Sequence, residues 1–415
     1  NELPDQMPDK PKSCKDPKGC TDPDNSQHKA YIDYSRTWSY STLPPITSGF
    51  NFNQTASSNR VSLHPQLLSV NVATEDGSHV GFNNDSTVGP GDTKSYVWYA
   101  GNLKWNEKPS GFVIQEAPVE FGIVGLRDMG DVIKHSSHGA IGALVVEPQC
   151  SSWIEDADTQ ASATVEHWDP IRDGERFICG PRPDKPQQFR EFVLLYQDDL
   201  SLQRNGLPIP NLRNADDSED TGQKAFNYRT EPIWSRLGAD PAVEPDQMLE
   251  LDWSNAFSSY ASNFRCKADP ANGKYCDPQT PIFRAKAGEK VRFRVAHVQG
   301  KPRNHGFTLF GHDWQTNPWE CSQQDWESGR RCNSSEQGFN VLNSNYVGST
   351  SGIGPSRHFN ILTVAGGEFK VPGDYMYRTQ EGFQFAGGLW GIFCVEGGEH
   401  RCDNRGQQSA GLTGK

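Results

Sequence analysis

Residues 304–314 read Asn-His-Gly-Phe-Thr-Leu-Phe-Gly-His-Asp-Trp, so that His305 and His312 flank a short apolar segment. The residues before it, 291–295 (VRFRV), alternate apolar and basic side chains, as a half-buried β-strand does. Downstream, residues 371–378 (VPGDYMYR) place a Pro-Gly turn before an aromatic strand, and residues 387–392 (GGLWGI) follow as an apolar strand. This order predicts the strands of one β-sandwich domain around the two histidines.

Composition supports a protein of short strands and many loops. The 415 residues are enough for two or three domains, and only 34% of them are hydrophobic, with 40 Gly and 28 Pro. The net charge of −12 and the lack of any Lys/Arg run argue against nucleic-acid binding. No apolar run approaches the roughly 20 residues of a membrane span. The chain begins with Asn1 and shows no signal peptide, which is typical of a mature, processed protein.

The ten cysteines indicate an oxidising compartment. They fall into five neighbouring couples without any CxxC, so that local disulfides are favoured over zinc or redox motifs: Cys14 with Cys20, Cys150 with Cys179, Cys266 with Cys276, Cys321 with Cys332, and Cys394 with Cys402. Asn53, Asn84 and Asn333 lie in glycosylation sequons, which matter if the source glycosylates its secreted proteins. We therefore expect a secreted protein, extracellular or periplasmic.

The chain divides into two predicted β-domains. A disulfide-looped tail (1–28) precedes domain 1 (29–148), a connector (149–187) leads to domain 2 (188–400), and a polar tail (401–415) follows. The clearest predicted strands cover residues 61–63, 95–99, 143–146, 189–196 and 281–283. Domain 2 contains an acidic insertion at residues 216–220, interpreted either as a cation or partner site or as a solvated loop.

The two domains share a pattern that carries a family resemblance. Each has a histidine segment, a Pro-Gly turn, an apolar-Arg step and a Gly-x-x-Gly strand, the last at residues 139–142 and 388–391. The segment from His305 to His312 resembles the copper-binding loop His-Pro-Phe-His-Leu-His-Gly-His of multicopper oxidases. Residues 61–66, with the Pro-Gly turn at 90–91, look like those of ceruloplasmin-like and large bacterial manganese-oxidase-like members. The resemblance covers roughly residues 60–150 and 188–396 and implies an all-β fold of tandem cupredoxin-like β-sandwiches with Greek-key topology.

The same resemblance implies that most copper ligands are replaced. The family holds a blue copper with one Cys thiolate and two His, and a trinuclear cluster with about eight His. The blue-site thiolate position is occupied by Thr379, and the His expected shortly after it corresponds to Gln384. Other histidine positions carry residues that bind copper poorly or not at all: Gln66, Arg127, Met129, Thr308, Phe310, Arg378 and Gln380. No cofactor is therefore expected, although copper binding at a residual site is possible.

Five histidines remain as candidate metal ligands: His64, His135, His138, His305 and His312. His135 and His138 fall near a blue-copper His position and can share a turn, but hydrogen bonding within a loop is the competing interpretation. His64 holds either a residual copper or a hydrogen bond to a backbone carbonyl.

Packing offers a second interpretation of the loop between His305 and His312. Its aromatic residues Phe307 and Phe310, with Trp314 beyond it, predict a loop that keeps its shape by core filling. In domain 1, Arg127 and the following Asp128 form either an ion pair or two solvated charges.

Two functions remain open from sequence. The first is an extracellular, multicopper-oxidase-like structural or assembly subunit, with a protein partner or a homo-oligomer. The alternative is a copper-dependent oxidase of metal ions or phenols whose sites are completed by a partner chain. Domain 1 shows no clear counterpart of the opening strand at residues 287–295, so either its strands have diverged in sequence or an upstream polypeptide or a partner supplies them.

All ten cysteines are predicted to be oxidised in the five neighbouring couples. Removing one couple should lower the free energy of unfolding by about 2–4 kcal/mol, because its loop is no longer closed in the unfolded state. Mass spectrometry of unreduced peptides checks the pairing. Free thiols or long-range pairs in the peptide map would contradict it.

Overall fold

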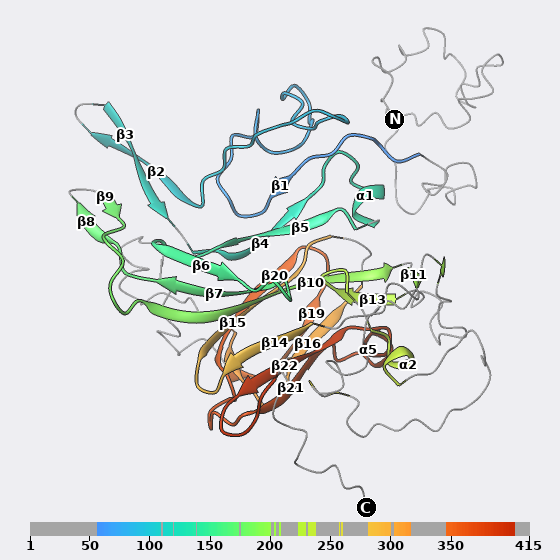
Figure 1. Ribbon diagram of the computed structural model, residues 1–415. Helices are drawn as coiled ribbons and strands as arrows, with labels where there is room; N and C mark the ends of the chain where they lie inside the picture. The colour runs from blue at the N-terminus through green and yellow to red at the C-terminus, as the bar shows by residue number, and fades with distance from the viewer. Residues whose placement is uncertain are drawn as a thin grey trace, which may run out of the picture.

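The computed structural model describes residues 56–208, 223–237, 281–316 and 346–402, apart from short gaps, together with Phe257 and Ser259. The described elements are almost all strands, which confirms the all-β prediction (Figure 1). None of the helices in this part of the chain has the length and apolar character needed to cross a bilayer.

A six-stranded sheet forms the central layer. Its path runs β20 (Arg357–Val364), β15 (Lys290–His297), β10 (Gln187–Leu200), β7 (Ser162–His167) and β6 (Ser151–Glu155), and β13 (Gln223–Phe226) pairs with the far end of β10. β10 and β15 are parallel, whereas the other pairings are antiparallel. The segment expected to be a connector thus contributes β6 and β7 to the central sheet.

A five-stranded sheet packs against one face of the central sheet. Its order is β14 (Ile282–Lys286), β22 (Trp390–Glu396), β21 (Gly373–Arg378), β16 (His305–Leu309) and β19 (Ser349–Ile353). The core between the two sheets is aromatic, with Phe192 against Phe283, Phe293 and Phe393 at ring-centroid distances of 4.8–5.3 Å. Because β14 and β16 lie in one sheet while β15 between them lies in the other, the chain crosses between the two sheets, as expected of a β-sandwich.

A smaller sheet covers the opposite face of the central sheet (Figure 1). It contains β1 (His64–Pro65), β4 (Gly122–Arg127) and β5 (Ile141–Val146), all antiparallel. Ile123 of β4 packs against Ala296 and Val298 at the end of β15. The described part of the molecule is therefore layered, with the central sheet in the middle.

This third layer changes the interpretation of residues 291–295. Their alternation predicts a strand with one solvated face, but every residue of β15 after Lys290 is buried. Val291, Phe293 and Val295 face the aromatic core, while Arg292 and Arg294 lie on the opposite side, beneath the small sheet. The basic residues of this strand therefore face glutamates of a covering layer and not solvent.

Arg294 is fully buried within a network of three glutamates. Its Nε donates to Glu191 Oε1 at 2.6 Å, and its terminal nitrogen lies 3.1 Å from Glu147 Oε2 and 3.6 Å from Glu120 Oε1. Arg292 forms a second ion pair with Glu120. These contacts join the central sheet to the segments that flank β4 and β5.

Asn360 of β20 connects the same network to β4. Its Oδ1 accepts hydrogen bonds from Arg294 Nη1 at 2.9 Å and from the Ile123 amide at 3.1 Å. Gly122 has a φ of +64°, and a Cβ at this position would lie 2.2 Å from Asn360 Oδ1. Only glycine therefore allows this close approach of β4 to the buried amide.

Short elements complete the fold. Two hairpins pair β2 (Gly101–Lys108) with β3 (Gly111–Pro118) and β8 (Ile171–Asp173) with β9 (Arg176–Ile178). Two further two-residue pairs join β11 (Gln203–Arg204) with β12 (Leu207–Pro208) and β17 (Trp314–Gln315) with β18 (Tyr346–Val347). The described helices are α1 (Lys134–Ser137), α2 (Ile233–Arg236) and α5 (Gly382–Ala386).

Residues 95–99, predicted as a strand, form only an isolated bridge between Tyr99 and Ser69. Their polar groups hydrogen-bond to nearby loops instead of to a sheet. The Tyr96 hydroxyl donates to the Ser86 carbonyl at 2.6 Å, and Trp98 Nε1 donates to the Glu75 carbonyl at 2.9 Å. The alternating aromatic pattern therefore served loop packing, and the strand prediction was wrong here.

Two of the five expected cysteine couples are confirmed. Cys150 is bonded to Cys179, and Cys394 is bonded to Cys402. The other couples lie outside the described residues, as do both tails except Arg401 and Cys402, the acidic stretch at 216–220, and the sequons at Asn53 and Asn333. Asn84, the third sequon, is exposed.

The Arg294 network predicts a pH-dependent stability. Burial raises the pKa of Glu147 to about 9, assisted by its hydrogen bond and repulsion with Glu191 and opposed by the charge of Arg294. Glu147 is thus protonated at neutral pH when folded but ionised when unfolded, and stability should fall by up to about 1.4 kcal/mol per pH unit between pH 5 and 9. Glu147→Gln, which mimics the protonated form, should flatten this slope in urea unfolding at several pH values.

Glu166→Gln is the matched control, since Glu166 pairs with Arg182 at a more exposed site. It should keep the slope of the unmodified chain. An unchanged slope in Glu147→Gln would show that this carboxyl is ionised in the folded state.

Candidate metal centre

His305, at the start of β16, is buried between two groups of polar side chains. On its Nδ1 side, Gln384 Oε1 of α5 accepts a hydrogen bond at 2.5 Å, and Thr379 Oγ1 lies 3.2 Å from the same oxygen. Gln384 Nε2 donates to the Asn304 carbonyl at 2.9 Å, so the amide is oriented with its oxygen toward His305. The amide oxygen can only accept, so His305 Nδ1 donates this hydrogen bond.

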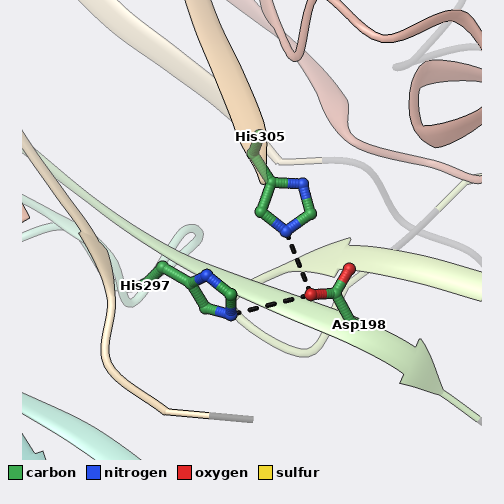
Figure 2. Close-up of side chains that lie close together, drawn as sticks. All are labelled: Asp198, His297 and His305. Atoms are coloured by element: carbon green, nitrogen blue, oxygen red, sulfur yellow. Dashed lines mark hydrogen bonds and ion pairs between the residues drawn. The ribbon is translucent and has the colours of Figure 1, made fainter. Parts of the chain in front are cut away.

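The Nε2 side of His305 faces Asp198 and His297 (Figure 2). His305 Nε2 lies 3.0 Å from Asp198 Oδ2, and His297 Nε2 lies 3.6 Å from the same oxygen. All three side chains are at most 1% exposed. Asp198 lies near the end of β10, His297 ends β15 and His305 begins β16, so three strands bring these groups together.

Electrostatics keep this group suited to a cation. Burial, with a further contribution from the neighbouring His305, lowers the pKa of His297 to about 4, so its imidazole is neutral at pH 7. Burial by itself would raise the pKa of Asp198, but the hydrogen bond from His305 and nearby positive charges hold that pKa below its ordinary value. One carboxylate and a neutral imidazole are common ligands of divalent metals.

Tyr196, on β10, fixes the orientation of the His305 ring. The two rings stack at a centroid distance of 4.8 Å and an interplanar angle of 26°. The buried Tyr196 hydroxyl donates to the Gly306 carbonyl at 2.7 Å, which connects the central sheet to β16. This contact holds the backbone beside His305 in place.

Four of the positions that the family resemblance assigns to copper ligands contact one another in two pairs. Gln384, at one blue-site position, accepts a hydrogen bond from His305, and Thr379, at the other, hydrogen-bonds to Gln384. Thr308 and Gln380, at two trinuclear positions, contact each other through a hydrogen bond from Gln380 Nε2 to Thr308 Oγ1. The residues present do not fit a blue copper, because a hydroxyl stands where a thiolate is required and His305 Nδ1 already donates to an amide oxygen.

The remaining predicted ligands in domain 1 have other partners. His64 Nδ1 donates to the Asp76 carbonyl at 2.6 Å, which agrees with the backbone interpretation. His135 contacts Asp128 through Nδ1 and the Ser58 carbonyl through Nε2, at 2.8 Å. Burial lowers the pKa of His135, but the hydrogen bonds to these two acceptors raise it overall. Both ring nitrogens of His135 therefore already have a partner within the protein. Asp128 is thus paired with His135.

His312 and Phe310 also differ from expectation. His312 donates through Nδ1 to the Phe310 carbonyl at 2.9 Å and accepts the Gly366 amide through Nε2 at 3.1 Å, so both ring nitrogens are occupied. Phe307 and Trp314 fill the core as predicted, but Phe310 is 45% exposed because it lies in the turn after β16. The expectation of core filling by Phe310 was wrong. His138 lies outside the described residues.

A second cluster of possible ligands lies at Asp374, Cys394 and His400. Cys394 is bonded to Cys402 and offers no thiolate. Asp374 also accepts hydrogen bonds from the amide and hydroxyl of Ser259. Among the described residues, the group around Asp198 is therefore the better metal site.

Sequence analysis found His305 but missed Asp198 and His297. Each of these two residues lies at the end of a strand that was predicted correctly. Strands β10 and β15 are parallel neighbours, so their carboxyl ends meet at one edge. A parallel pairing cannot be recognised from one sequence, and without it the two residues show no common pattern.

Comparison with solved structures finds copper proteins. A multicopper oxidase matches 82% of this chain and 71% of its own, at a TM-score of 0.38 and 14% identity. The blue copper oxidase from Nitrosomonas europaea matches 82% of this chain and 70% of its own, at a TM-score of 0.38 and 13% identity. The copper nitrite reductase from Nitrosomonas europaea matches 82% of this chain and 75% of its own, at a TM-score of 0.37 and 14% identity. At these identities the likeness concerns the fold, and no residue role is transferred from it.

Sequence comparisons give no closer relation: no family model and no curated protein matches the chain.

Tyr196→Phe tests the contact beside His305. Removing the buried hydroxyl leaves the Gly306 carbonyl without this donor, which should lower the free energy of unfolding by about 1–3 kcal/mol. Tyr375→Phe is the matched control, because its hydroxyl donates to the Val371 carbonyl at an exposed site. It should change stability by less than about 0.5 kcal/mol. Equal effects in urea unfolding would show that the Tyr196 hydroxyl has no special role.

Proposed function

We propose that this chain is an extracellular, cupredoxin-like structural or assembly subunit that no longer holds the blue copper of a multicopper oxidase. The proposal rests mainly on one observation, the hydrogen-bonded group of His305, Gln384 and Thr379. A blue site needs a thiolate and two imidazoles that converge on the metal. In this chain the group is buried and closed by its own hydrogen bonds, as expected when packing has replaced a metal.

The secreted location is supported by the disulfides and by an exposed sequon. Cys150–Cys179 and Cys394–Cys402 are bonds that persist in oxidising compartments. Asn84 is exposed, so its side chain is accessible to a glycan. These features favour a protein that functions outside the cytosol.

A partner is supported by the edge of the central sheet. β6 pairs with β7 on one side and with no described strand on the other. Trp153 and Ile154, which point to opposite faces of β6, are both exposed. An exposed edge strand with apolar side chains is a surface onto which another chain can pair.

Copper loading of the purified chain tests the proposal. With Mn(II), Fe(II) or a phenol as reductant, the loaded chain should show no blue-copper absorbance and no oxygen uptake above a buffer control. The reason is that hydroxyl and amide oxygens supply neither the thiolate nor the imidazoles of that chemistry. Sustained turnover with about four coppers per chain would instead support the oxidase alternative.

A second experiment restores the missing blue-copper ligands by mutation. The double variant Thr379→Cys/Gln384→His should gain a blue-copper absorbance, because Gln384 already contacts His305 Nδ1 and Thr379 contacts Gln384. Each single variant is a matched control and should gain none. A colourless, correctly folded double variant would contradict the assignment of these positions to a former blue site.

A further inference from the structure

We infer that Asp198, His297 and His305 form a binding site for one divalent transition-metal ion, for which zinc is the best match. The site uses the Nε2 side of His305, away from Gln384 and Thr379. It goes beyond the proposed function, since a structural subunit needs no metal here.

The spacing of the three donors fits a tetrahedral ion. Two ligands that are each about 2.0–2.1 Å from zinc lie about 3.3 Å apart. The observed separations from Asp198 Oδ2 are 3.0 Å to His305 Nε2 and 3.6 Å to His297 Nε2. All the donor atoms lie within 4.8 Å of one another, so modest side-chain shifts suffice to place them around one ion.

Hydrogen bonding leaves one side of His305 facing the other two groups. Gln384 accepts a hydrogen bond from His305 Nδ1, so the ring nitrogen that faces Asp198 Oδ2, at 3.0 Å, is Nε2. Metal-bound histidines ordinarily donate their other ring N–H to an oxygen acceptor, as His305 does to Gln384.

Unused donor atoms point in the same direction. Asp198 Oδ1 and His297 Nε2 are buried, and neither forms a hydrogen bond with any residue in the described ranges. Buried polar atoms without partners are costly, and a metal ion would satisfy both. The second carboxylate oxygen also offers a fourth ligand position.

The donor set selects the class of ion. Two imidazoles and one carboxylate suit zinc and similar borderline ions, whereas calcium and magnesium favour oxygen ligands. The charge of Lys224 acts on Asp198 and opposes a second cation, so binding should be weaker than at a site without it. The bound ion would join β10 and β15 of the central sheet to β16 of the opposite sheet.

Zinc binding to the full chain tests the inference. Because the site is buried, the metal-stripped chain is incubated with zinc over days or refolded in its presence, and bound zinc is counted by elemental analysis. We expect one zinc per chain and a melting temperature that rises with zinc concentration. Cobalt(II) in place of zinc should give the absorption of a site with nitrogen and oxygen ligands.

Variants assign the zinc to these residues. Asp198→Asn and His297→Gln each remove a ligand and should weaken zinc binding more than 100-fold, whereas Gln384→Leu, which removes only the partner of His305, should weaken it about 10- to 100-fold. Asp374→Asn is the control for the second cluster and should bind zinc as the unmodified chain does. Melting temperatures measured in the presence of a chelator identify any variant that fails to fold. If one ligand variant fails to fold, the other ligand variant and the cobalt spectrum show whether these residues bind the metal.

Absence of zinc from the unmodified chain overturns the inference, as does zinc retained by both ligand variants or lost in Asp374→Asn. The proposed function is judged separately, by blue-copper absorbance and oxygen uptake. A chain that binds zinc and has no oxidase activity agrees with both proposals. A chain that neither binds zinc nor has oxidase activity refutes only the metal site.

Discussion

The described structure depends on the burial of Arg294 between two layers. A guanidinium can lie in a dry interior only if acceptor oxygens surround it, and here oxygens of Glu191, Glu147, Glu120 and Asn360 do so. These partners come from the central sheet itself and from the segments around the small sheet. Loss of the small sheet and its flanking segments would remove two of these partners, so this layer and the central sheet are coupled by electrostatics as well as by apolar contact.

That coupling explains why β15 is buried on both faces although it contains two arginines among its buried residues. One face supplies Phe293 to the aromatic core, and the other supplies the arginines to the glutamates. The resulting rigid strand ends at His297, and its parallel neighbour β10 carries Asp198 to the same edge. The site at His305 is thus a product of the charge network, because the network fixes the strand that positions one of its three groups.

Much of the fold could be predicted from single-strand patterns. The strands that became β10, β14, β15, β21 and β22 were identified by alternation and turn residues. What failed depends on contacts between distant segments. The sequence at 95–99 has strand composition but bonds to loops, and β6 and β7 join a sheet that also contains β15 and β20, which come much later in the chain. Asp198 and His297 become neighbours only through the parallel pairing, which leaves no local signal.

The hydrogen bond from Ile123 to Asn360 has a consequence for how the chain reaches its native state. The two residues are 237 positions apart, and Arg294 and Glu191 are separated by 103. Contacts of such long range give a high contact order. This slows folding, because the chain loses the entropy of closing large loops before the stabilising contacts can form. During synthesis the small sheet emerges long before β15 and β20, so its glutamates have no guanidinium to meet. The amino-terminal half therefore cannot complete its packing until the rest of the chain is synthesised. Until then its unpaired strand edges are exposed to aggregation.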